Sequence, residues 1–110
     1  MNLTSTHRDG FSVITIDGRL TASGAPRLRD AVKELVEAGR TRIVVDLGGT
    51  EFVDSSGLGA LIGGLKAARV AGGDLRIAAV PDAVRTVMRL TNLDRVLREH
   101  ASPETAFDGR

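Results

Sequence analysis

The segment Phe52-Val53-Asp54-Ser55-Ser56-Gly57-Leu58-Gly59-Ala60-Leu61 joins an apolar strand to an amphipathic helix. An acidic residue and two serines precede the helix, and side-chain oxygens there accept hydrogen bonds from the free N–H groups of the first turn. Capping does not require Gly57 or Gly59, each of which lowers helix propensity by about 1 kcal/mol relative to alanine. Because glycine has no Cβ, we expect another molecule to approach the backbone closely there. The junction is therefore the predicted interaction site.

The elements on either side of this junction are predicted from apolar spacing. Ile43–Leu47 is a nearly continuous apolar run typical of a buried central strand, which Gly48-Gly49 should end. Phe52-Val53 would then be a short extended stub. After the serine pair, which should start the helix, an apolar stripe predicts a helix ending at Gly72-Gly73. The stripe consists of Leu58, Leu61, Ile62, Leu65 and Ala68.

The N-terminal third predicts a hairpin and a helix. Phe11–Asp17 alternates apolar and polar residues with period two, so it predicts a strand with one buried face, paired with residues 3–7 through the Asp9-Gly10 turn. From Ser23 to Gly39, apolar residues recur at helical spacing, with Ser23 as the expected cap and Gly39 as the stop.

The C-terminal third predicts one more strand and helix. Residues 75–80 should form a strand, and Pro81-Asp82 should open a helix. The inward residues of that helix would be Val84, Val87, Met88 and Thr91. Val96-Leu97 is expected to form an edge strand, and Ser102-Pro103-Glu104 a helix start.

Strands that alternate with helices favour crossover connections. The predicted fold class is α/β: a mixed, mostly parallel sheet with an N-terminal β-hairpin and helices packed on it. At 110 residues, the chain is expected to form a single domain over residues 1–110.

Composition favours a protein partner. The 15 Lys and Arg nearly balance the 14 Asp and Glu, so the net charge of +1 provides no strong field for nucleic acid or for an anionic membrane. The chain has no Trp and no Tyr to stack on bases. There is no cysteine and no apolar N-terminal run of signal-peptide or membrane-span length, so we expect a cytoplasmic protein without disulfides.

Catalytic and cofactor motifs are incomplete. Gly59 and Gly64 have the spacing of an ATP-binding loop, but Leu65 stands where lysine is required. His7 and His100 are the only histidines and lie near opposite ends of the chain, so neither a metal site nor a Ser/His/Asp triad is predicted. We expect no enzyme activity and no cofactor. Helix capping alone remains the simplest alternative explanation of the serine pair.

The Asp-Ser-Ser-Gly-Leu-Gly sequence of residues 54–59 resembles the signature of the bacterial anti-sigma factor antagonists, which are single STAS domains. The resemblance is densest over residues 43–73. It implies that the unphosphorylated protein binds an anti-sigma factor serine/threonine kinase and so releases a sigma factor. By position, it implies that the kinase phosphorylates Ser55 and that a separate phosphoserine phosphatase reverses this. ATP would belong to the kinase.

The same resemblance implies a partner-binding loop, formed by Asp54, Ser56, Gly57, Leu58 and Gly59. After Gly18-Arg19-Leu20, where the better-known antagonists commonly carry an aspartate, this chain has Thr21. We expect Thr21 to lie near Ser55 and to alter kinase efficiency or partner choice. Two alternatives remain: a STAS module that binds a small anion or nucleotide at the same helix N-terminus, and a partner-switching regulator of a non-transcriptional target.

Overall fold

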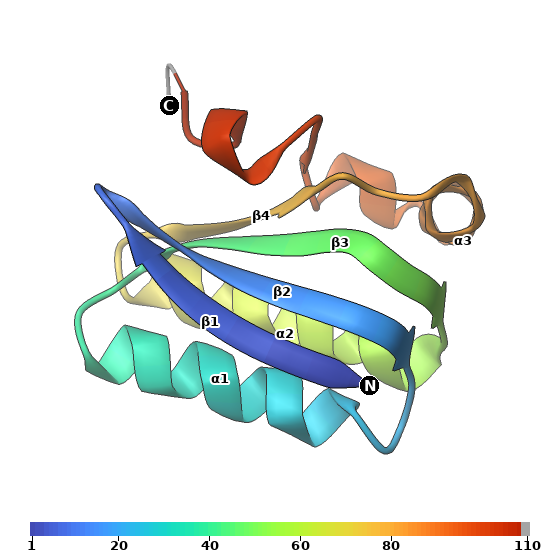
Figure 1. Ribbon diagram of the computed structural model, residues 1–110, viewed down its shortest axis with the longest axis horizontal. Helices are drawn as coiled ribbons and strands as arrows, with labels where there is room; N and C mark the ends of the chain where they lie inside the picture. The colour runs from blue at the N-terminus through green and yellow to red at the C-terminus, as the bar shows by residue number, and fades with distance from the viewer. Residues whose placement is uncertain (109–110) are drawn as a thin grey trace.

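The structure is a computed structural model that describes residues 1–108, and its centre is a five-stranded sheet in the order β1-β2-β3-β4-β5 (Figure 1). β1 pairs antiparallel with β2, and the other three pairings are parallel. The α/β prediction is therefore confirmed. The elements are β1 (Asn2–Arg8), β2 (Phe11–Leu20), α1 (Ala25–Glu37), β3 (Arg42–Val53), α2 (Ser55–Val70), β4 (Asp74–Ala78), α3 (Asp82–Leu90) and β5 (Glu99–His100), with 3-10 turns at Leu93–Arg95 and Pro103–Thr105.

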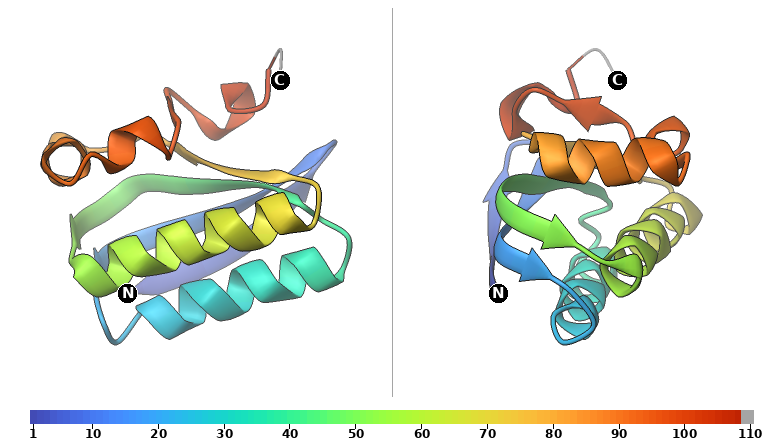
Figure 2. Two further views of the ribbon diagram at one scale, coloured as in Figure 1. Left: turned by 180° about the vertical axis from the view of Figure 1, so that it is seen from behind. Right: turned by 90° about the vertical axis from the view of Figure 1, so that its right-hand side faces the viewer.

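The helices cover both faces of the sheet. α1 and α2 lie side by side on one face, and α3 and the C-terminal segment lie on the other (Figure 2). The main core lies between α1, α2 and the sheet and includes Ile14, Leu28, Val45, Leu61 and Leu65, all at most 2% exposed. A smaller core on the opposite face consists of Val13, Val44, Ala78, Ala106 and Phe107, with Phe11 packed against it.

The β1–β2 hairpin forms as predicted. Arg8 pairs with Phe11 across the Asp9-Gly10 turn, and Gly10 has a φ of 85°, a left-handed conformation that glycine adopts at little cost. This turn lies at one end of the sheet, and the carboxyl ends of β2 and β3 lie at the other (Figure 1).

The prediction that Gly48-Gly49 ends the central strand is wrong. β3 continues to Val53, because two register shifts against β2 accommodate extra residues in β3. The buried hydroxyl of Thr50 donates a hydrogen bond of 2.8 Å to the Ile16 carbonyl and so supports the strand beyond the first shift. Phe52 and Val53 are therefore the last residues of a long strand that leads directly into the junction.

Three smaller predictions also fail. Gly24, with no side-chain cap, precedes α1 in place of Ser23, because a turn closed by the Thr21 carbonyl and the N–H groups of Gly24 and Ala25 sets the helix start. Thr91 follows the last residue of α3 and is exposed. Leu97 is buried but lies outside the sheet, because its N–H donates to the Leu93 carbonyl at 2.9 Å.

Within residues 1–108, no helix has both the length and the apolar character needed to cross a bilayer.

Candidate functional site

The start of α2 is capped by Asp54. Asp54 has an extended backbone, and its Oδ1 accepts a hydrogen bond from the Gly57 N–H at 2.9 Å. Its carbonyl accepts the N–H of Leu58 at 2.9 Å, which closes the first turn. The expectation that the serines begin the helix holds for Ser55, its first residue, but the capping group is the aspartate. Among residues 1–108, no side-chain hydrogen bond engages the hydroxyl of Ser55 or Ser56.

The same aspartate ties α2 to the turn after β2. Its Oδ2 accepts a hydrogen bond from the Ala22 N–H at 3.3 Å, and its own N–H donates to the Leu20 carbonyl at 3.2 Å. Thr21 lies between these two contacts in the chain, so it stands at the same end of the sheet as Ser55. The predicted proximity of Thr21 to the Ser55 loop is therefore confirmed. The Thr21 hydroxyl is 3.4 Å from the Ser23 hydroxyl.

Ser55 is exposed and occupies the first position of α2, whereas Ser56 is half-buried. The N-terminus of a helix carries a partial positive charge and free N–H groups, which stabilise a nearby anion. A phosphate on the Ser55 oxygen can therefore be accommodated without disturbing the cap, which Asp54 supplies.

Gly57 has a different role from the one we predicted. A Cβ at this position would clash with the carbonyl oxygen of Leu20 and lie 2.8 Å from its Cγ and 3.0 Å from Cγ1 of Val53. The missing side chain makes room for this chain's own strands, so our reason for expecting a partner at Gly57 is wrong. Leu58 is also directed inward and belongs to the main core, with 8% exposure. A contact of either residue with a partner remains untested.

Gly59 faces outward. It is exposed, and the nearest atom to a Cβ at this position would be Nη2 of Arg29 in α1, at 3.7 Å. Gly64 differs: it is buried, and a Cβ there would lie 3.0 Å from Leu75 Cδ1 and 3.2 Å from Val32 Cγ2, so close packing explains this glycine. Gly59 is thus the glycine that leaves the surface of α2 flat beside the serines.

Sequence reasoning missed three residues at this end. The Arg19 guanidinium lies 4.8 Å from the centre of the Phe52 ring, and the two are register partners at the ends of β2 and β3. Phe52 is 40% exposed, an unusual position for a phenylalanine. Successive side chains of a strand point to opposite faces, so the burial of Val53 was the available indication that Phe52 points outward. Nothing in the spacing indicated that Arg29 would reach Gly59 from another helix.

The site has no metal-binding or triad geometry. Within residues 1–108, no three His, Asp or Glu side chains gather as metal ligands. His7 hydrogen-bonds Ser12 near the hairpin turn at 3.2 Å, and His100 lies on β5. What the arrangement offers is an exposed hydroxyl at a helix N-terminus, next to a carboxylate held in place by backbone N–H groups.

Comparison with known proteins identifies the family of this chain. The family model described as "Mlab, STAS domain" matches residues 4–99. The chain belongs to the STAS domain family. This STAS domain is 27% identical over 104 residues to the anti-sigma-B factor antagonist of Staphylococcus aureus, a match covering 94% of this chain and 96% of that protein.

Solved structures show the same fold. An anti-sigma factor antagonist from Mycobacterium paratuberculosis is 26% identical, with a TM-score of 0.85 over 98% of this STAS domain and 92% of that chain. The Bacillus cell fate determinant SpoIIAA in its phosphorylated form is 19% identical, with a TM-score of 0.76 over 99% and 100% of the two chains.

Proposed function

We propose that this chain is an anti-sigma factor antagonist regulated by phosphorylation of Ser55. In its unphosphorylated form it binds an anti-sigma factor that is also a serine/threonine kinase, and the bound sigma factor is released. The Ser55 oxygen bonds to the γ-phosphorus of the kinase's ATP, the bond from that phosphorus to ADP breaks, ADP leaves, and the hydroxyl proton passes to a base of the kinase or to water. A phosphoserine phosphatase restores the binding form.

The observation that carries this proposal is the placement of Ser55. Its hydroxyl is exposed at the first position of α2 and is not used for capping, because Asp54 supplies that bond. Because Asp54 occupies the cap position, the hydroxyl of Ser55 at the first helical position has no capping bond to make and stays available for modification. The likeness to antagonists from Staphylococcus aureus and Mycobacterium paratuberculosis supports the choice of partner.

The contact surface that fits this role is the exposed part of the junction. It comprises Thr21, Asp54, Ser55, Ser56 and Gly59, with the backbone of Gly57 and Leu58 behind it. Phosphorylation adds about 1.5 to 2 negative charges next to the Asp54 carboxylate. A charge buried without a partner in a protein interface costs several kcal/mol, so the modified surface no longer binds.

The experiment is phosphorylation by the cognate kinase. The chain is incubated with ATP and anti-sigma kinases from its own host, and its intact mass is measured. We expect a gain of one phosphate, lost in Ser55→Ala and retained in Ser56→Ala. A phosphate that maps to Ser56 would overturn the assignment of the site.

Pull-down with and without ATP tests the partner. We expect the captured kinase to hold a sigma factor when this chain is absent. If the captured kinase controls a different target, the switch remains but its output is not transcription. A ligand-dependent thermal shift without any mass change would instead support the small-anion sensor.

A further inference from the structure

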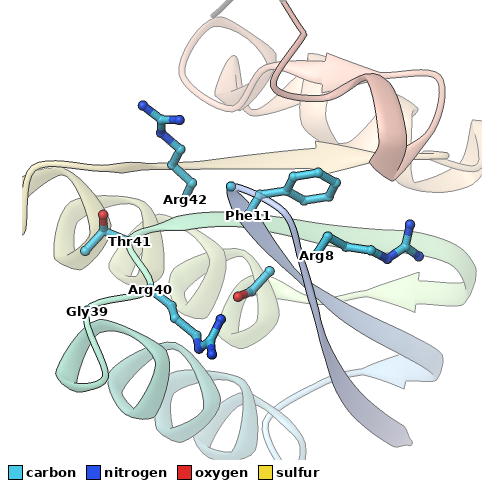
Figure 3. A pocket seen from close by; sticks show the side chains of 8 residues that line it. Arg8, Phe11, Gly39, Arg40, Thr41 and Arg42 are labelled. Carbon is cyan, nitrogen blue, oxygen red and sulfur yellow. The ribbon is translucent and has the colours of Figure 1, made fainter.

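A second feature lies at the opposite end of the sheet from Ser55. A hollow of about 310 Å³ opens there between the β1–β2 turn and the segment that joins α1 to β3. Its cationic lining residues come from three places in the chain: Arg8 from the end of β1, Arg40 from the connection, and Arg42 from the start of β3. Figure 3 shows these side chains extending away from one another, so their guanidinium groups are spread around the hollow and not gathered inside it.

These cations are largely unneutralised. Within residues 1–108, neither Arg40 nor Arg42 forms an ion pair with an acidic side chain. Arg8 has one contact, to Glu104 at 3.7 Å, and both side chains are about half exposed or more, at 45% and 62%. Such an exposed pair contributes little and is readily exchanged for a better anion.

The neighbouring arginines provide a contrast. Arg69 and Arg76 share the single carboxylate of Asp74, at 3.2 and 3.1 Å, so one of their two charges is compensated. Arg40 and Arg42 differ from them in having no acidic partner among residues 1–108. Although the whole chain has a net charge of only +1, three arginines line this one hollow, and no acidic residue among residues 1–108 does.

Other lining groups fit a phosphorylated ligand. Thr41 contributes a hydroxyl donor, and Phe11 borders the hollow and contributes an apolar surface. Phe11 also stacks on Phe107 of the C-terminal segment, with ring centres 6.2 Å apart. A hollow of this size accommodates a small molecule. Guanidinium groups bind phosphate oxygens through two parallel hydrogen bonds, and arginine is the preferred residue for this geometry.

We propose that this hollow is a binding site for a small anion that carries two or more phosphate groups. Because the guanidinium groups extend apart from three segments, one phosphate cannot contact all of them, whereas linked phosphates can reach more than one. The site is independent of Ser55: its residues lie at the other end of β2 and β3, and it needs no kinase.

The test uses inorganic tripolyphosphate as the probe, added to the full chain labelled with nitrogen-15 for NMR titration. We expect saturable amide shifts in residues 8–12 and 39–42, with affinity at least tenfold higher than for orthophosphate. The double variant Arg40→Gln/Arg42→Gln should lose at least tenfold in affinity while its thermal midpoint stays close to that of the wild type.

The matched control is Arg89→Gln/Arg95→Gln, which removes the same charge from α3 and the following turn. We expect it to keep nearly all of the affinity. An equal loss in both double variants would show general charge attraction and overturn the site, as would shifts centred on Ser55. Equal affinities for tripolyphosphate and orthophosphate, or tighter binding of a glutamate hexapeptide, would overturn the proposed ligand class.

Discussion

The carboxylate of Asp54 accepts the N–H of Ala22 at 3.3 Å, across 32 positions of sequence. Its other oxygen accepts the N–H of Gly57 at 2.9 Å, so one side chain fixes both the turn after β2 and the first turn of α2. The two loops of the candidate site are therefore one structural unit, and Ser55 is held between a cap on one side and a tied turn on the other.

Substitutions of Asp54 should separate these two bonds. Asp54→Ala removes both acceptors and should lower the free energy of unfolding by about 1 to 2 kcal/mol, a typical loss for a cap. Asp54→Asn retains one oxygen for Gly57 but presents an amide NH₂ in place of the second acceptor, so we expect an intermediate loss. Urea denaturation measures both. Identical stability of the two variants would show that only one of the bonds matters.

Gly57 and Gly59 form a matched pair with opposite expected effects. Gly57→Ala places a methyl group against Leu20 and Val53, and we expect a loss of stability of about 1 to 3 kcal/mol from overpacking. Gly59→Ala meets only an ordinary contact with Arg29 and gains helix propensity, so we expect stability to rise by up to about 1 kcal/mol.

Affinity for the kinase should be affected at the glycine where stability is not. Gly59→Ala should weaken association with the kinase, because its methyl group projects from the exposed surface beside the serines. Isothermal titration of each folded variant gives the comparison. Undiminished affinity of Gly59→Ala would remove this part of α2 from the interface.

Charge at Ser55 should control affinity. We expect Ser55→Ala to bind the kinase at least as well as unmodified protein, and the phosphorylated form to bind at least about 100-fold more weakly, or about 2.7 kcal/mol. Ser55→Asp should fall between them because it carries less charge and fewer oxygens. Surface plasmon resonance with the kinase immobilised would measure all three. Equal affinities of the phosphorylated and unmodified forms would contradict the switch.

His100 should make stability depend on pH. Its Nε2 is buried without a hydrogen-bond partner among residues 1–108, and burial, aided by Arg76 and Arg98 and opposed by Asp74, lowers its pKa below 6.5. The unfolded chain then binds more protons than the folded chain below pH 6.5. Stability should therefore fall as the pH decreases from 6.5 toward the folded pKa.

Urea denaturation at pH 7 and pH 5 measures this effect, with His100→Gln as the control that cannot titrate. We expect the variant to lose less stability than the wild type between these values. Glu99 acts in a lower window: its hydrogen bond with Arg85 lowers its pKa below 4.5, so its contribution is lost only under more acidic conditions. The same pH dependence in both proteins would contradict the assignment to His100.

The fold could be predicted from the sequence because the spacing of apolar residues was unambiguous in most elements. The stripe of Leu61 and Leu65 admitted one orientation against a core, and the continuous apolar run of β3 required burial on both faces of the sheet, as observed. Predictions failed where contacts with another element determined the local structure. Gly48 and Gly49 resemble a strand end, but register shifts against β2 keep them within β3.

The site was predicted in its location but not in its orientation. Asp54, Ser55 and Thr21 come together as expected, whereas Gly57 turned out to face Leu20. A residue pattern does not reveal which side of a helix start faces another strand. The basic hollow could not be predicted for a related reason. Arg8 and Arg40 are far apart in sequence, and only the fold brings them to the same hollow.

β3 starts at Arg42 beside the basic hollow and ends at Val53, one residue before Asp54. It is paired with β2 from Ile43 to Val53 and with β4 from Arg42 to Asp46, so it joins the two ends as one continuous strand. If both proposals hold, the two occupants would not touch, and one domain would hold both in a ternary complex. If one occupant alters the affinity of the other, thermodynamic linkage requires the reverse effect to be equal in size.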